Sequence, residues 1–247
     1  MISSVGIIGY GRFGRVAARF LSKRAQVYVH DPALRSTNRL PHGARRATLA
    51  EASARPVVVL AVPISRLEAL LSRIRSTVLP GALVCDVCSV KSLPVAWMKR
   101  LLPRSVKVIG THPLFGPDSV TGSLKGHRII VCPGRSTRGD LHTVCEALAA
   151  AGLAVEVMTP AAHDRLMAET LLLAQYIGRL PGAAGIPLHE RTTPSYSYVK
   201  SLAAVAMNDT EQLFRDMWSY NPAGKGIARR IAAGHRRLLG KVTRRGR

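Results

Sequence analysis

The sequence predicts an α/β fold, a doubly wound sheet covered by helices, followed by an all-helical second part. Two observations support this prediction. Short β-branched runs alternate with helical stretches up to residue 158, which is the pattern of a parallel sheet with helices on both faces. After residue 159 these runs stop, and apolar residues recur at helical spacing. We therefore expect two domains, residues 1–158 and residues 159–247.

The individual elements follow from the apolar pattern. Strands are predicted over residues 5–8, 27–30, 57–62, 83–87, 106–109, 129–132 and 154–157. The run at 57–62 is continuously apolar and is ended by Pro63, as expected for a strand that is buried on both faces. Helices are predicted over residues 12–21, 66–75, 93–102 and 140–151 in the first domain, and over 161–179, 196–206, 210–218 and 227–239 in the second.

A glycine-rich loop joins the first predicted strand to the first helix. Its residues are Gly9, Tyr10, Gly11, Arg12, Phe13 and Gly14. This spacing between a strand and a helix is typical of a Rossmann-type dinucleotide site, because the glycines allow a tight turn, close backbone approach to the pyrophosphate and close helix packing. The free amides at the helix start then face the phosphates. We assign all six residues to the cofactor site, together with Val62 and Pro63.

An acidic residue at the end of the second strand indicates which dinucleotide binds. Asp31 lies 17 residues beyond Gly14, near the position of the acid that bonds the adenosine ribose hydroxyl. A carboxylate there would repel a 2′-phosphate, so the sequence favours NAD. Arg35 and Arg39 follow closely and could accommodate that phosphate, so an NADP alternative stays open.

Two polar segments, residues 86–92 and 110–117, each come straight after a predicted strand. The active site of a doubly wound sheet lies in the crevice beyond the carboxyl ends of its strands, so both segments are expected there. Ser89 can exchange hydrogen bonds with a cofactor or substrate, and His112 can take up a proton near neutral pH. A histidine between a strand and a proline can also simply satisfy local backbone groups.

The charge balance favours anionic partners. The chain has 36 Lys and Arg against 14 Asp and Glu, a formal net charge of +22. This surplus suits nucleic acid, acidic membrane surfaces or small polyanionic ligands, and does not choose among them. Aromatic residues make up only 5% of the chain, which supplies no interleaved stacking platform, so nucleic acid is not the expected partner. The arginine-rich stretch from Lys225 onward is expected to be a solvated basic face.

No apolar run approaches the length of a membrane span, so we expect no membrane partner. The first strand-like run begins already at Val5, which leaves no room for a signal peptide and favours a cytoplasmic location. Cys85 and Cys88 could form half of a metal or redox motif, but a zinc site would want a second pair. We expect core thiols and no metal.

Several segments together resemble the prephenate and arogenate dehydrogenase family of tyrosine biosynthesis, and most closely its compact plant-type arogenate enzymes. Beside the glycine loop, they are Asp86-Val87-Cys88-Ser89-Val90-Lys91, Thr111-His112-Pro113-Leu114-Phe115-Gly116-Pro117, His163-Asp164, and Leu213-Phe214-Arg215-Asp216-Met217 with Asn221 beyond it. The resemblance implies a nicotinamide-dependent oxidative decarboxylation of a cyclohexadienol, with arogenate or prephenate as the small anionic substrate. It also implies a homodimer formed through the helical domain.

The resemblance further implies roles for individual residues. His112 would take the hydroxyl proton as hydride leaves, and Ser89 would orient the same hydroxyl. The substrate-binding residues would be Ser89, Lys91, His112, His163, Gln175 and Lys200. Gln175 stands where family members commonly carry a second histidine. The arginine that binds the substrate carboxylate in many members has no clear counterpart in this sequence. The candidate substitutes are Lys200, Arg179 and Arg191. His163-Asp164 can alternatively cap its helix.

Two other functions remain compatible with the sequence. One is a different two-domain Rossmann-type reductase acting on a hydroxy acid or an imine, which would need neither Ser89 nor His112. The other is a non-catalytic, basic nucleic-acid-binding protein that uses the same fold. The choice between arogenate and prephenate also stays open.

Overall fold

The computed structural model describes residues 3–34, 40–191 and 193–243. The chain forms two compact units, Met1–His163 and Asp164–Arg247, and each is described by itself. The division falls within helix α6 (Pro160–Met167). In the described part of the chain, no helix combines the length and the apolar character that crossing a membrane requires.

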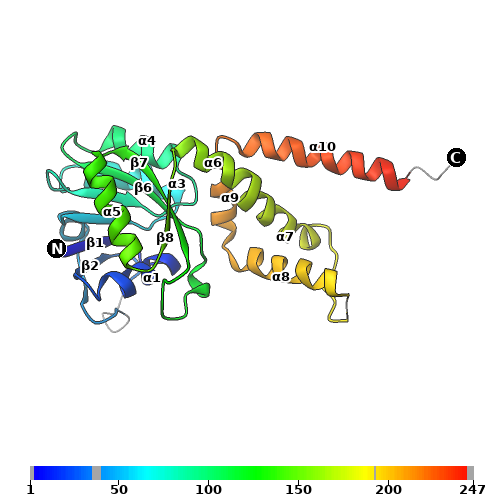
Figure 1. Ribbon diagram of the computed structural model, residues 1–247, viewed down its shortest axis with the longest axis horizontal. Coiled ribbons are helices and arrows are strands. Elements are labelled where there is room, and N and C mark those ends of the chain that lie inside the picture. The colour runs from blue at the N-terminus through cyan, green and yellow to red at the C-terminus, as the bar shows by residue number, and fades with distance from the viewer. Residues whose placement is uncertain (1–2, 35–39, 192, 244–247) are drawn as a thin grey trace. The chain divides into compact units, whose positions relative to one another are not determined.

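The first unit is built on an eight-stranded sheet with the order β3-β2-β1-β4-β5-β6-β7-β8 (Figure 1). The strands are β1 (Ser4–Ile8), β2 (Gln26–His30), β3 (Ala44–Arg46), β4 (Val57–Leu60), β5 (Leu83–Asp86), β6 (Lys107–Pro113), β7 (Arg128–Arg135) and β8 (Ala154–Val157). Neighbouring strands are parallel except β6 and β7. The chain leaves β1 toward β2 and returns on its other side as β4, so the sheet has a topological switch point between β1 and β4.

Helices cover both faces of this sheet (Figure 1). They are α1 (Arg12–Leu21), α2 (Leu49–Ser53), α3 (Ile64–Ile74), α4 (Ser92–Leu101), the 3₁₀ turn η2 (Pro117–Ser119) and α5 (Arg138–Ala150). α1 and α5 contribute to one hydrophobic cluster, in which Val16 and Leu148 pack around Ile129. α3 and α4 contact each other. The doubly wound fold class that the sequence predicts is confirmed.

The structure corrects one strand of the prediction in a way that matters for the site. The strand expected at 106–109 continues to Pro113, because its antiparallel pairing with β7 runs on to the pair Pro113↔Ile129. His112 therefore lies inside β6 and not in the loop after it. The antiparallel β7 also makes the sheet mostly, not wholly, parallel. The short β3 and α2 were not predicted; α2 begins with a capping box formed by Thr48 and Glu51.

The second unit is entirely helical in its described residues. After α6 the chain passes through a π-helical turn, η3 (Ala168–Leu172), into α7 (Leu173–Ala183), and then forms α8 (Pro194–Asn208), α9 (Glu211–Tyr220) and α10 (Gly224–Thr243). Its core contains Leu172, Met217 and Ile227. α7 and α8 approach closely at Gly178, where a Cβ would stand 2.6 Å from the Cβ of Ala206. Asn221 fixes the turn into α10 by donating to the Asp164 carbonyl at 2.9 Å.

Candidate active site

The glycine loop follows β1 and opens α1, and two of its glycines are required by close packing. Gly9 has a φ of 101°, and a Cβ there would stand 2.3 Å from the Ala61 carbonyl oxygen. A Cβ on Gly14 would stand 2.1 Å from the Gly9 carbonyl oxygen. Gly11 instead faces open space, with no atom within 4 Å of the position of a Cβ. The loop therefore packs tightly on both sides of a position where a ligand can approach the backbone.

The first turn of α1 has no side-chain cap. Gly11 is its N-cap and has no side chain to accept from the first amides, and the first turn contains no acidic residue. A ten-residue helix that starts in this way offers its amides and its positive dipole end to an anion. This arrangement suits a pyrophosphate.

Asp31 lies at the end of β2 and is bonded to the glycine loop. Its Oδ2 accepts from the Tyr10 backbone amide at 2.6 Å, and its Oδ1 accepts from the Ala33 amide at 2.8 Å. The carboxylate is thus held beside the loop by two backbone donors, with lone pairs left for a ribose hydroxyl. Arg35 and Arg39, the residues behind the NADP alternative, lie outside the described residues.

Val62 and Pro63 follow β4, on the other side of the switch point from β2. The Val62 Cγ1 lies 3.1 Å from where a Gly9 Cβ would stand, so this strand end lies against the glycine loop. Pro63 is the N-cap of α3 and is exposed. The fold therefore brings together the predicted cofactor residues from three strand ends.

The segment after β6 contacts the start of α1. The rings of Phe13 and Phe115 are 5.9 Å apart, and Arg12 forms an ion pair with Asp118. The two side chains of that pair are 38% and 63% exposed, so its contribution to stability is small. Its consequence is geometric, because it ties the strand end that carries His112 to the glycine loop. The Arg12 guanidinium, expected to bind the cofactor, thus has a partner within the protein.

A buried ion pair joins the ends of β5 and β6. The Lys91 Nζ donates to Asp86 Oδ2 and, at 2.7 Å, to the Thr111 carbonyl, and both charged side chains are fully buried. Asp86 Oδ2 also accepts from the Cys88 amide at 3.0 Å. Gly110 makes room for the lysine, since a Cβ there would stand 3.2 Å from Lys91 Cδ. The prediction that Lys91 contacts substrate does not fit this placement, because its ammonium group is enclosed by protein.

His112 and His163 form a second buried pair. His112 Nδ1 and His163 Nε2 are 2.8 Å apart, and the rings meet edge to face with centroids at 5.0 Å. His112 is 7% exposed and His163 is fully buried. The pKa of His112 is held well below its ordinary value of 6.5, first by burial and then by the nearby His163 and Lys91. His112 is therefore a neutral imidazole at neutral pH.

Ser89 follows β5 and has an unused hydroxyl. Its Oγ is buried and has no hydrogen-bond partner among the described residues. Leaving a buried hydroxyl unpaired costs about 1–3 kcal/mol. A group of this kind at a strand end indicates a place for a ligand or water. It lies one strand away from His112, because β5 and β6 are neighbours.

The remaining predicted residues lie in the helical unit and have different partners. Gln175 is 4% exposed, and its Nε2 donates to Asp209 Oδ2 at 2.8 Å. Lys200 instead pairs with the exposed Glu190 at 3.0 Å. Arg179 donates to the Asp209 carbonyl at 3.0 Å, whereas Arg191 is exposed. Asp209 was not among the residues predicted from the sequence. The available signal was its position directly before Thr210, the N-cap of α9, and four residues before the apolar Leu213.

The cysteines are consistent with the expectation that they are thiols of the hydrophobic core. The structure describes all four, and none forms a disulfide. Burial and the neighbouring Asp86 raise the pKa of Cys85 to about 12, which opposes thiolate chemistry at neutral pH. Among the described residues, no cluster of three His, Cys, Asp or Glu side chains could hold a metal ion.

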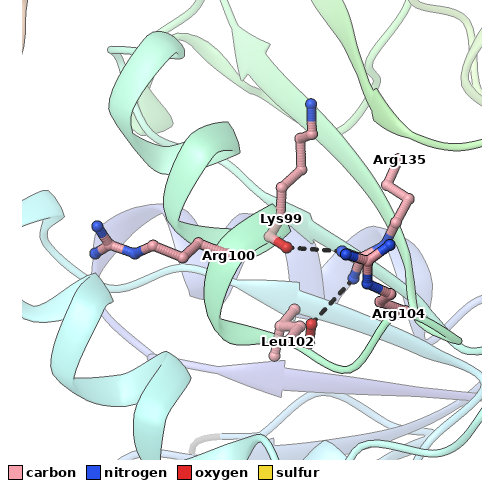
Figure 2. Close-up of a pocket in the computed structure, with 5 residues that line it drawn as sticks. All are labelled: Lys99, Arg100, Leu102, Arg104 and Arg135. Carbon is pink, nitrogen blue, oxygen red and sulfur yellow. Dashed lines mark hydrogen bonds between the residues drawn. The ribbon is translucent and has the colours of Figure 1, made fainter.

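A basic cavity lies near the start of β6, at the end of the sheet opposite the candidate active site. It has a volume of about 550 Å³, and Figure 2 shows its lining residues, Lys99, Arg100, Leu102, Arg104 and Arg135. Arg135 donates to the carbonyls of Lys99, Leu102, Pro103 and Val106, so its guanidinium satisfies the carbonyls at the end of α4. The cavity lies where β6 begins, whereas Ser89 and His112 lie toward the carboxyl ends of β5 and β6. It is not part of the candidate active site.

Comparisons with known sequences agree with this geometry. Residues 24–157 match the family described as prephenate dehydrogenase, nucleotide-binding domain. A probable arogenate/prephenate dehydrogenase of Methanocaldococcus jannaschii is 28% identical over 180 residues, which are 69% of this chain and 40% of that protein. Arogenate dehydrogenase 1, chloroplastic, of Arabidopsis thaliana is 26% identical over 239 residues, which are 92% of this chain and 37% of that protein. The chain thus spans less than half the length of these two relatives.

A solved structure shares the fold. Prephenate dehydrogenase from A. aeolicus, in complex with hydroxyphenyl propionate and NAD+, matches with a TM-score of 0.76 at 20% identity, covering 98% of this chain and 89% of that one. At this identity the likeness establishes the architecture alone.

Proposed function

The chain belongs to the prephenate dehydrogenase family through its nucleotide-binding domain, and we propose that it is a nicotinamide-dependent dehydrogenase that oxidatively decarboxylates arogenate or prephenate. One observation carries the proposal. His112, which is buried and neutral, lies near the end of β6, and the unpaired hydroxyl of Ser89 follows the neighbouring strand β5. The segment after His112 contacts the glycine loop. This arrangement supplies a base, a hydrogen-bonding group and a dinucleotide-binding loop along one edge of the sheet.

The two histidines determine where a proton can go. In the neutral pair, we assign the proton on His112 to Nδ1, which donates to His163 Nε2. His112 Nε2 is then bare and can accept the hydroxyl proton of a cyclohexadienol as hydride leaves the carbinol carbon. The resulting imidazolium keeps its bond to His163. His163 is therefore a positioning residue that selects the tautomer of His112.

The buried ion pair has a positioning role in this scheme. Lys91 bonds the Thr111 carbonyl, directly before His112, and so fixes the end of β6 against Asp86. Its positive charge also opposes protonation of His112. We propose that Lys91 keeps the base in place and neutral and does not contact substrate.

The glycine loop fits NAD. Open space at Gly11, the uncapped start of α1 and the tethered carboxylate of Asp31 match the pyrophosphate and the adenosine ribose. A 2′-phosphate would meet the negative charge of Asp31, so we propose NAD over NADP. When bound, the nicotinamide would accept the hydride. The A. aeolicus relative is described with NAD+, in agreement with this assignment.

A polar cluster in the helical unit favours an amino acid over an oxo acid as substrate. Gln175 Oε1, Arg179 Nε and Trp218 Nε1 are buried and have no hydrogen-bond partner among the described residues. Two unpaired donors suit a carboxylate, and an unpaired acceptor beside the Asp209 carboxylate suits an ammonium group. Of the two candidate substrates, arogenate carries both groups. We therefore propose arogenate, with Gln175 as a substrate-binding residue and Lys200, which pairs with Glu190, as a weaker candidate.

We also propose that the chain pairs with a second copy through α7 and α8. Large apolar side chains are exposed along these helices, among them Tyr198 at 77%, Val205 at 65% and Met207 at 62%. Ile177 and Leu180 on α7 are 40% and 46% exposed. Exposed large apolar side chains of this kind suit a protein interface, and a symmetric dimer is the commonest way to cover them.

Steady-state turnover of arogenate and prephenate, each with NAD and NADP, tests the proposed function. We expect arogenate with NAD to give the highest kcat/KM, and His112→Asn to lower kcat by about 10²–10⁴-fold. His142→Asn is the matched control, because His142 is exposed and pairs only with Glu146 in the described structure. Full activity in His112→Asn would overturn the assignment of the base. No turnover of either substrate by the unmodified chain would overturn the function.

A further inference from the structure

The last helix, α10, separates cations from apolar side chains along its length (orange to red in Figure 1). At about 100° per residue, its large aliphatic residues gather on one side: Ile227, Ile231, Leu238 and Val242, with Leu239 at the margin. The opposite half carries Lys225, Arg229, Arg236 and Arg237, while Arg230 and Lys241 lie at the margin of the apolar side away from Leu239. The sequence of α10 contains no acidic residue, and its one ion pair given by the described structure joins Arg230 to the exposed Glu169.

The two halves of the apolar side differ in their surroundings. Ile227 is 7% exposed, and Ile231 packs with it against the core of the helical unit. Further along the helix, Leu238 is 65% exposed and Val242 is 77% exposed. The second half of α10 thus holds its aliphatic side chains in solvent, and covering them would be favourable.

We propose that the second half of α10 lies on a bilayer surface that contains anionic lipids, with Leu238, Leu239 and Val242 inserted at the boundary between headgroups and acyl chains. An interfacial helix needs an apolar side that enters this boundary and a basic side whose long side chains reach the lipid phosphates. α10 has both. Each cation near such a surface strengthens binding about fivefold.

This proposal revises one expectation from the sequence. The lack of a long apolar run excludes only helices that cross a bilayer. A helix that lies in the interface needs a narrow apolar side of a few residues, and this requirement is met by residues spaced at helical intervals. The proposal is also independent of the dehydrogenase function, which uses other residues.

Other occupants fit the same side less well. Nucleic acid would use the cations but not the aliphatic side chains, and α10 contains no Phe, Tyr or Trp on which a base could stack. A second copy of α10 would bring two sets of cations together without an acid on either helix, so like charges would oppose the pairing. An anionic bilayer satisfies both sides of the helix at once.

Cosedimentation of the full chain with lipid vesicles tests this proposal. The vesicles consist of phosphatidylcholine alone or of equal parts of phosphatidylcholine and phosphatidylglycerol. We expect binding to the anionic vesicles alone, weakened by salt. Leu238→Gln/Leu239→Gln/Val242→Gln keeps every charge and should weaken binding by roughly tenfold or more, because three inserted aliphatic groups are lost. Arg236→Gln/Arg237→Gln should weaken it by at least about tenfold.

The matched control is Arg73→Gln/Arg75→Gln, which removes the same charge from exposed positions at the end of α3 and should change binding by less than about twofold. Circular dichroism and arogenate turnover in buffer verify that each variant is folded, and they separate this proposal from the proposed function. Unchanged vesicle binding by the triple glutamine variant would overturn the proposal. So would conversion of a dimer to a monomer by that variant, or binding to duplex DNA without binding to anionic vesicles.

Discussion

Two buried pairs of side chains lie next to each other toward the carboxyl ends of β5 and β6, and they are constructed differently. Asp86 and Lys91 are charged, fully buried and linked to both strands by further hydrogen bonds. His112 and His163 are joined by a single hydrogen bond, and His112 is neutral and keeps a small exposed area. The charged pair fixes the position of the strand ends, and the neutral pair leaves one nitrogen available to exchange a proton.

The largest expected effect comes from breaking the charged pair. Lys91→Met would leave Asp86 buried without its counter-ion, so we expect the free energy of unfolding to fall by about 3–5 kcal/mol. Urea unfolding measures this loss. Lys107→Met is the matched control, because Lys107 also pairs with an aspartate, Asp140, but is 44% exposed and should cost at most about 1 kcal/mol. Equal losses in the two variants would show that the buried pair has no special structural role.

Replacing the second histidine should act on the reaction more than on the fold. In His163→Asn the His112 Nδ1 loses its acceptor, so the base-competent tautomer is no longer selected, and we expect kcat to fall by about 10²-fold. KM should change little, because His163 is fully buried in the structure. His142→Asn again controls for the loss of a histidine. If KM rose while kcat stayed constant, His163 would instead be a substrate-binding residue.

The neutral state of His112 predicts a pH dependence of stability. Its pKa in the folded chain lies below 6.5, so between that pKa and 6.5 the unfolded chain binds more protons. The stability that comes from keeping His112 neutral is therefore fully present above pH 6.5. As the pH falls from 6.5 toward the pKa of His112 in the folded chain, the free energy of unfolding decreases by about 1.4 kcal/mol per pH unit. Urea unfolding of the unmodified chain and of His112→Asn, at about pH 7 and about pH 5, should show a larger acid loss in the unmodified chain. Parallel losses would contradict this prediction.

The smallest expected effect concerns Ser89. Ser89→Ala removes a hydroxyl that has no partner among the described residues, so stability should stay constant or rise slightly. If the hydroxyl orients the substrate, kcat/KM should fall by about tenfold, the value of one hydrogen bond. Ser72→Ala, on the exposed side of α3, should change neither quantity. A loss of stability without a loss of activity would indicate that Ser89 is structural.

The sequence predicted the parts of the site that depend on local pattern. The glycine spacing, Asp31 after the second strand and the polar ends of two strands are visible in the residues themselves. The extension of β6 to Pro113 was not predictable, because it depends on pairing with β7, which is distant in the sequence. The same limit applies to the bond between His112 and His163, and to the enclosure of Lys91 by Asp86 and Thr111, which tertiary packing alone determines.

The central claim is that His112 is a neutral base whose Nε2 is bare because His163 accepts from its Nδ1. Nitrogen-15 NMR of the histidine rings tests this claim directly, with the His112 signals assigned by their absence from His112→Asn. We predict that at neutral pH the His112 Nδ1 carries the proton and Nε2 carries none, and that the ring stays neutral below pH 6.5. A doubly protonated ring at neutral pH, or a proton on Nε2, would contradict the account.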